Sequence, residues 1–151
     1  MSTIRFKVDA SKQLKKMVNK IAYVEKAIRV ENLLKAMNRL GTVWTGDIKR
    51  GFTEGRDLYG DQWSALKNPS EARGGSSAKP LLDTGRLVGS INFVIQDGKL
   101  IISTNVPYGK FHQDGTQNIR KRAFLPDERG LPTKFKNDLE QSLESILKNM
   151  V

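Results

Sequence analysis

The sequence contains no cysteine and only one histidine, His112, among its 151 residues. The missing cysteines exclude disulfides, thiol catalysis and thiolate metal sites, and a single histidine excludes an imidazole-rich metal site within one chain. No apolar run approaches the ~20 residues that a membrane span needs, and the N-terminus lacks the apolar core of a secretory signal. We therefore expect a protein that is cytoplasmic when it is made, contacts no membrane and needs no cofactor.

Acidic residues are also few, since 16 Asp and Glu stand against 26 Lys and Arg, which gives a formal net charge of +10. The excess lies mostly in the first 60 residues. Non-specific binding to nucleic acid uses such an excess, but a solvated helix face has the same composition. The 38% apolar and 28% charged residues are ordinary for a soluble domain. We expect a single domain over residues 1–151, with DNA contact left open.

The N-terminal third predicts one strand and two helices. Apolar residues alternate with basic ones at Ile4, Phe6 and Val8. This period of two predicts a short edge strand. Ser11 is placed to cap an amphipathic helix that continues to about Ile28. A second helical stripe covers residues 30–52, although Gly41 and Gly46 inside it each cost about 1 kcal/mol of helix propensity.

Residues 53–80 carry glycines, prolines and a serine-rich tract, and they predict a long loop. Loops of this length in a compact domain are usually functional or flexible. Trp63 and Leu66 are expected to pin the first half of the loop to the core, and residues 67–80 are expected to be its flexible part.

A β-hairpin is the strongest local prediction, because Asp97 and Gly98 separate two apolar runs. A two-residue type I′ turn there places three cross-strand pairs on one face. The predicted pairs are Ile95 with Leu100, Phe93 with Ile102, and Ile91 with Thr104. The opposite face is expected to be wetter. Before the hairpin, Asp83 is predicted to cap a short helical turn over residues 84–88.

A last helix is predicted after Pro132, with Thr133 as its cap and apolar residues at helical spacing from Phe135 to Met150. Helices at both ends and a hairpin between them indicate an α+β fold, in which an antiparallel β-sheet packs with N-terminal helices and a C-terminal helix.

Catalytic patterns are sparse. His112 lies two residues before Asp114, so a Ser-His-Asp hydrolase is one interpretation. No Gly-x-Ser-x-Gly element accompanies them, and the glycine tract at residues 74–79 lacks the spacing of a phosphate-binding P-loop. A half-buried histidine satisfied by backbone, or by a neighbouring chain, is the simpler interpretation.

Three segments, taken in order, carry a family resemblance. They are Gly-Asp-Gln-Trp-Ser-Ala-Leu at residues 60–66, Lys-Pro-Leu-Leu-Asp-Thr-Gly-Arg-Leu at residues 79–87 leading to Ser90 and Ile91, and residues 104–108 together with Phe-His-Gln-Asp-Gly at residues 111–115. Over about residues 50–125 the chain resembles the phage virion morphogenesis proteins, the Mu-like G and tail completion group. Residues 120–125 occupy the place of that family's arginine-proline-phenylalanine-leucine element, with alanine instead of proline.

The resemblance implies a non-enzymatic structural protein of the phage head-tail neck, located in the virion and in the host cytoplasm during assembly. Such a protein completes or terminates the tail and helps join it to the DNA-filled head, with a fold similar to small neck and tail-terminator proteins that act as rings. The implied partners are copies of itself in a homo-oligomeric ring, neighbouring neck, connector and tail tube proteins, and, non-specifically, DNA in the channel. The alternative is a basic DNA-binding or packaging accessory protein.

The same segments supply the candidate interface residues, called the motif residues below: Trp63, Leu82, Asp83, Gly85, Arg86, Leu87, Tyr108, His112, Gln113, Gly115, Arg122, Phe124 and Leu125. Arg86 is placed for a charge-assisted contact, and Arg122 with Phe124 and Leu125 forms a basic and apolar anchor. The rings of Tyr108 and His112 share a helical face by their spacing. For Leu82, Asp83, Gly85, Arg86 and Leu87 the alternative role is maintenance of the fold. For Tyr108, His112 and Gln113 the alternative to an interface is the edge of the core.

Overall fold

A computed structural model of the chain describes residues 3–9, 11, 15, 30–67 and 79–149. The predicted helix from Ser11 to Ile28 and the predicted flexible loop fall largely outside these residues. The elements in chain order are β1 (Ile4–Val8), α2 (Val30–Glu54), α3 (Arg86–Ser90), β2 (Asn92–Gln96), β3 (Lys99–Thr104), α4 (Gly109–Asp114) and α5 (Thr133–Lys148).

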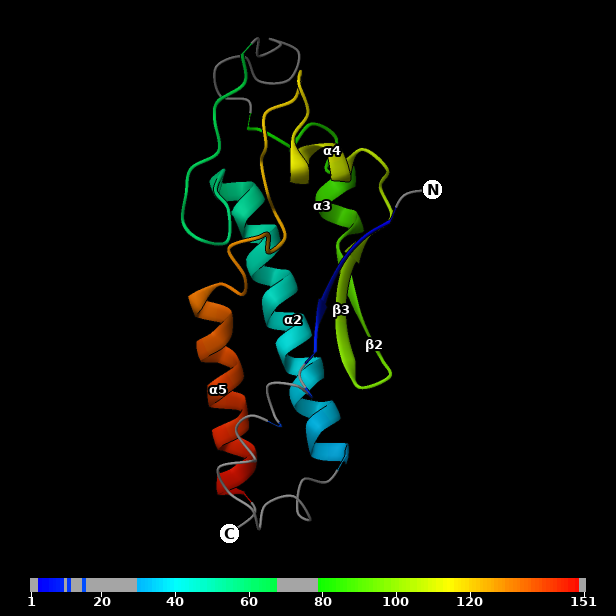
Figure 1. The fold of residues 1–151 in the computed structure, drawn as a ribbon, viewed down its shortest axis with the longest axis vertical. Coiled ribbons are helices and arrows are strands. Elements are labelled where there is room, and N and C mark those ends of the chain that lie inside the picture. Colours follow the sequence, from blue (N-terminus) through cyan, green and yellow to red (C-terminus); the bar gives the residue numbers. More distant parts are fainter. Residues whose placement is uncertain (1–2, 10, 12–14, 16–29, 68–78, 150–151) are drawn as a thin grey trace.

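Helix α2 runs through the middle of the molecule, with α5 on one side and the sheet on the other (Figure 1). The sheet has the strand order β1-β3-β2, and both neighbouring pairs are antiparallel. The α+β class is therefore confirmed, and β1 is an edge strand as predicted. The short helices α3 and α4 lie together at the upper end of the sheet in Figure 1.

The hairpin is confirmed at its turn and at two of its three predicted pairs. Asp97 has φ 52° and Gly98 has φ 69°, which are the two left-handed positions of a type I′ turn. Phe93 pairs with Ile102 and Ile95 pairs with Leu100. The third pair is wrong, because β2 begins at Asn92 and the preceding residue, Ile91, ends helix α3 in the core instead.

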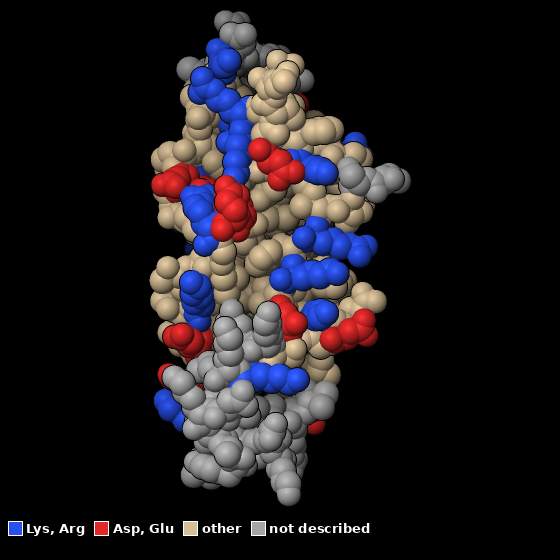
Figure 2. Space-filling model, viewed as in Figure 1, with Lys and Arg blue, Asp and Glu red and all other residues tan. Residues whose placement is uncertain are grey.

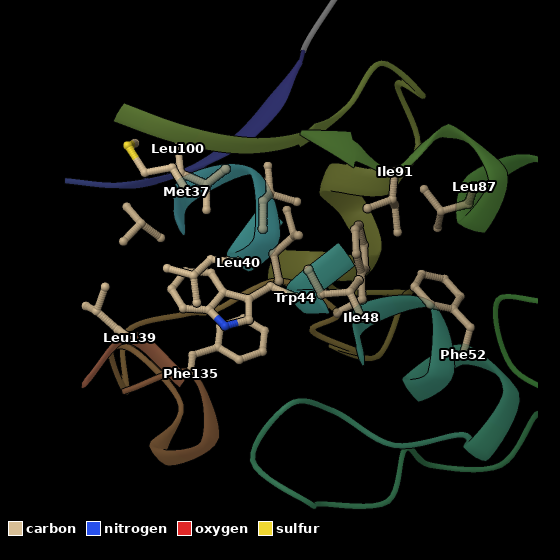
Figure 3. Close-up of a cluster of buried hydrophobic side chains, with 14 of the residues drawn as sticks. Met37, Leu40, Trp44, Ile48, Phe52, Leu87, Ile91, Leu100, Phe135 and Leu139 are labelled. Carbon is tan, nitrogen blue, oxygen red and sulfur yellow. The ribbon is translucent and has the colours of Figure 1, made fainter. Parts of the chain in front are cut away.

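The core forms where α2 meets both of its neighbours (Figure 3). In this core, the ring of Trp44 on α2 stacks on the ring of Phe135 on α5, with ring centroids 4.5 Å apart and planes 2° from parallel. The indole Nε1 donates a hydrogen bond to Asp138 Oδ2 at 3.1 Å. The buried apolar side chains of α2 are Met37, Leu40, Trp44, Ile48 and Phe52. One helix therefore ties the sheet to α5.

Two predicted element ends are wrong. Helix α2 continues through Thr53 to Glu54, so the loop starts at Gly55. Thr133 is not the cap of the last helix but its first residue. Pro132 stands at the cap position without a side-chain bond, and its carbonyl accepts from Lys136 N–H at 3.0 Å. A proline at a helix start suits its fixed φ, which accounts for the difference.

Gly41 is required in α2 because β2 approaches the helix there. A Cβ atom at residue 41 would lie 2.4 Å from Cδ2 of the Phe93 ring. Gly46, one and a half turns later, is exposed and would place a Cβ in open space. The two glycines thus lower helix propensity equally but differ in what surrounds them.

We predict opposite effects for the two Gly→Ala changes. Gly41→Ala should destabilise the protein by about 1–3 kcal/mol, because the Phe93 ring must shift to avoid overpacking. Gly46→Ala should stabilise it by up to about 1 kcal/mol, since alanine is the better helix former. Chemical denaturation measures both, and a stabilising Gly41→Ala would contradict this account of the helix–sheet contact.

Candidate functional site

The residue at the N-terminal cap of helix α3 is Gly85 and not the predicted Asp83. Gly85 occupies the cap position in the left-handed region, with φ 72°, and no side chain caps the helix. The hydroxyl of Thr84 instead accepts the backbone N–H of Arg86 at 3.3 Å. The prediction that Asp83 caps residues 84–88 is therefore wrong, since the chain turns at a glycine that needs no side-chain partner. Leu87 is buried and Arg86 is exposed.

Helix α4 carries the predicted pair of rings. Tyr108, at the start of α4, and His112, one turn later, meet edge to face with centroids 6.2 Å apart. Burial, together with the positive charge of Arg122, lowers the pKa of His112 below its ordinary value, so the imidazole is neutral at pH 7. Its buried Nδ1 has no hydrogen-bond partner. Gly115, with φ 76°, ends the helix and donates to the carbonyl of Phe111 at 2.9 Å.

Gln113 holds the 122–125 segment against α4 through its side-chain amide. Its Oε1 accepts the backbone N–H groups of Phe124 and Leu125, both at 3.0 Å, and its Nε2 donates to the carbonyl of Leu125 at 2.9 Å. The side chain is buried, and it forms hydrogen bonds with three backbone groups that would be paired with a neighbouring strand in a sheet.

Arg122 joins the same segment to the first half of the long loop. Its backbone N–H donates to the carbonyl of His112 at 2.7 Å. Its guanidinium donates to the carbonyl of Ser64 at 2.8 Å and 3.0 Å, and to that of Ala65 at 3.2 Å. Arg122 is only 8% exposed, and burial lowers its pKa. The carbonyl oxygens thus compensate the cost of burying the cation.

Beneath these segments lies an aromatic cluster at the C-terminal end of α2. Phe52 meets Trp63 edge to face and Phe124 at a tilt, each with centroids 5.4 Å apart. Trp63 Nε1 donates to the carbonyl of Ala123 at 3.1 Å. Trp63 therefore packs against the core, as predicted. Phe124 and Leu125, which were candidate interface residues, are each only 2% exposed and pack inside the chain.

An open cleft of about 450 Å³ lies between α3, α4 and the 122–125 segment. It brings together seven motif residues, which range along the sequence from Asp83 to Arg122. Its lining consists of Leu66, Leu81, Asp83, Thr84, Gly85, Arg86, Leu87, Tyr108, His112 and Arg122. The remaining motif residues do not line it: Trp63, Leu82, Gln113, Gly115, Phe124 and Leu125.

The cleft contains His112, the histidine of the hydrolase interpretation. A triad histidine is oriented by a carboxylate at Nδ1, and the Nδ1 of His112 forms no such bond. Among the described residues, no three His, Asp or Glu side chains are placed to hold a metal ion. The cleft is lined by apolar side chains, by the rings of Tyr108 and His112, and by Arg86 and Arg122.

A second polar cluster, centred on Arg129, was not predicted from the sequence. The guanidinium of Arg129 pairs with Asp57 at 2.8 Å, Asp127 at 2.9 Å and Asp61 at 3.0 Å, and lies 3.7 Å from the ring centroid of Tyr59. These hydrogen bonds from Arg129 hold the pKa of Asp127 well below its usual range. The cluster clamps the loop after α2 to the loop before α5.

The comparisons with known proteins give the family. The chain is an α+β protein in which seven of the motif residues line one cleft. It matches the Phage virion morphogenesis family over residues 9–149, and it belongs to that family. No curated protein and no solved structure matches it. Membership associates the protein with the phage virion and its assembly, and no helix of the described residues is long and apolar enough to span a bilayer.

We predict that Gln113→Leu destabilises the protein by about 2–4 kcal/mol, because two N–H groups and one carbonyl lose their only partners in a buried position. Gln141→Leu, on the exposed face of α5, is the matched control and should change the stability by less than about 0.5 kcal/mol. Urea denaturation measures both, and equal stabilities would show that Gln113 does not hold the segment.

We also predict that Arg129→Gln raises the pH at which the protein unfolds in acid. The folded-state pKa of Asp127 lies below its unfolded value, so the ionised carboxylate contributes stability above about pH 4 that is lost as the pH falls. Without the arginine this contribution disappears. Circular dichroism during acid titration measures the midpoint, and an unchanged midpoint would refute the assignment.

Proposed function

We propose that this protein completes the phage tail at the head-tail neck, as one subunit of a homo-oligomeric ring, and that the α3–α4 cleft is where it contacts a neighbouring copy. Family membership supports a structural role in the virion. The observation that carries the finer proposal is the convergence of the motif residues on one open cleft beside exposed aromatic side chains.

The surface beside the cleft has the composition of a protein interface. Phe111 is 51% exposed and Tyr108 is 37% exposed, and both project from the short helix α4. Arg86 lies exposed on the rim of the same cleft. Aromatic residues and arginine are the side chains that most often dominate binding energy, and exposing large rings to water is unfavourable for an isolated chain.

Copies of this chain can assemble into a ring if the cleft of one copy binds a different surface of the next copy. Such head-to-tail contacts repeat by rotation and close when the angle divides the circle. The neck, connector and tail tube proteins would then stack on the two faces of the ring. In this proposal the protein performs no chemical reaction, and its function is to present a geometrically closed surface to which a tail and a head can both attach.

We predict that deleting the gene from its phage leaves filled heads and tails that do not join. Supplying Arg86→Ala should lower the infective titre at least tenfold relative to the wild-type chain, because losing ~1.4 kcal/mol in a contact lowers an association constant tenfold. Plaque counts and electron micrographs of the lysates measure the outcome.

Lys136→Ala is the matched control for this experiment, because Lys136 is an exposed cation on α5 outside the cleft. It should restore the wild-type titre. Circular dichroism of both purified variants should match the wild type, since neither side chain is buried. Joined, infective particles in the deletion strain would contradict the proposed role, and full rescue by Arg86→Ala would contradict the role of the cleft.

A further inference from the structure

The outer face of the sheet carries positive charge around a central residue, Ile101, that is only 6% exposed. Helices α2 and α5 both lie on the opposite side (Figure 1), where the inward side chains of the strands join the core. Alternation along the paired strands defines which residues face outward. They are Arg5 and Lys7 on β1, Lys99, Ile101 and Ser103 on β3, and Asn92, Val94 and Gln96 on β2.

No acidic residue belongs to this outer face. The nearest two, Asp9 and Asp97, follow the last residues of β1 and β2, and Asp9 accepts a hydrogen bond from the hydroxyl of Ser11. The ion pairs of the described residues lie on α2, on α5 and in the loops beside them, and none includes a cation of the sheet. Figure 2 shows Lys and Arg side chains on both sides of the molecule in this view, several of them on the side that the sheet occupies.

This arrangement is unfavourable for the fold by itself. Arg5 and Lys7 lie about 7 Å apart on the same side of one strand, and their like charges repel without a carboxylate between them. A solvent-facing position of a strand can be occupied by any polar residue, charged or uncharged. The exposed cations therefore fit a partner that is negatively charged.

We propose that the outer face of the sheet binds the phosphate backbone of duplex DNA, without reading its sequence. The charged side chains of this face are all basic. Val94, 50% exposed, is its one strongly exposed large apolar residue, and no aromatic side chain belongs to it. It lacks the aromatic anchors of a protein interface and the stacking rings that bind single strands, which leaves electrostatic contact with a duplex.

This surface is separate from the α3–α4 cleft, so DNA binding does not depend on the proposed ring contact. The test compares two variants of equal charge. Arg5→Gln/Lys7→Gln/Lys99→Gln removes the outer-face cations, and Arg39→Gln/Lys136→Gln/Lys148→Gln removes one arginine and two lysines that are exposed on α2 and α5. Circular dichroism checks the folding of both, and Lys7→Gln alone serves if the first triple variant does not fold.

The probe is a fluorescent duplex of mixed sequence, bound at several salt concentrations. Each lost phosphate contact should reduce the slope of log K against log salt by about 0.9, so the sheet variant should lose about 2–3 in slope and at least about tenfold in affinity at low salt relative to the control variant. Lys7→Gln alone should lose about 1 in slope.

Equal losses in the two triple variants would overturn the proposal, because binding would then follow net charge rather than this face. Tighter binding of poly-glutamate than of the duplex, lost in the sheet variant, would also overturn it and indicate an acidic protein partner. Light scattering of the same variants reports their oligomeric mass separately, so failure of the ring and failure of DNA binding are distinguishable.

Discussion

The structure depends on one constraint, which is that α2 must be buried on two sides along its length and also at its C-terminal end. The sheet approaches one side closely enough to require Gly41, and α5 stacks Phe135 on Trp44 on the other. At the end of the helix, Phe52 contacts both Trp63 and Phe124. The helix therefore fixes where residues 63–67 and the 122–125 segment meet, although neither of these described segments forms a helix or a strand.

The α3–α4 cleft is a consequence of that meeting point. The side chains of Gln113 and Arg122 hold irregular segments in place by hydrogen bonds to backbone groups, and both residues are largely buried. The exposed cleft residues Arg86 and Tyr108 stand at the start of the short helices α3 and α4, and the exposed Phe111 lies on α4. The motif thus divides into a buried part that maintains the fold and an exposed part that is available to a partner.

Features that depend on neighbouring residues were predictable, and features that depend on distant ones were not. The Asp97-Gly98 turn and the apolar period of α2 are local, and both predictions are confirmed. The start of α3 was predicted wrongly because the left-handed turn at Gly85 replaces the expected aspartate cap. Arg129 and Asp57 are 72 positions apart, so no sequence pattern could pair them. The motif residues taken from the resemblance include seven that line the cleft and six that do not, and the resemblance did not indicate which of them are buried.

The central claim is that copies of this chain form a closed ring at the neck, with the α3–α4 cleft at each subunit boundary. Electron cryomicroscopy of the neck in the mature phage particle tests it most directly. The account predicts a ring of density between head and tail into which this fold docks, with Arg86 and Phe111 of each copy covered by its neighbour. A neck without this chain, or a ring in which the cleft faces solvent in every copy, would contradict it.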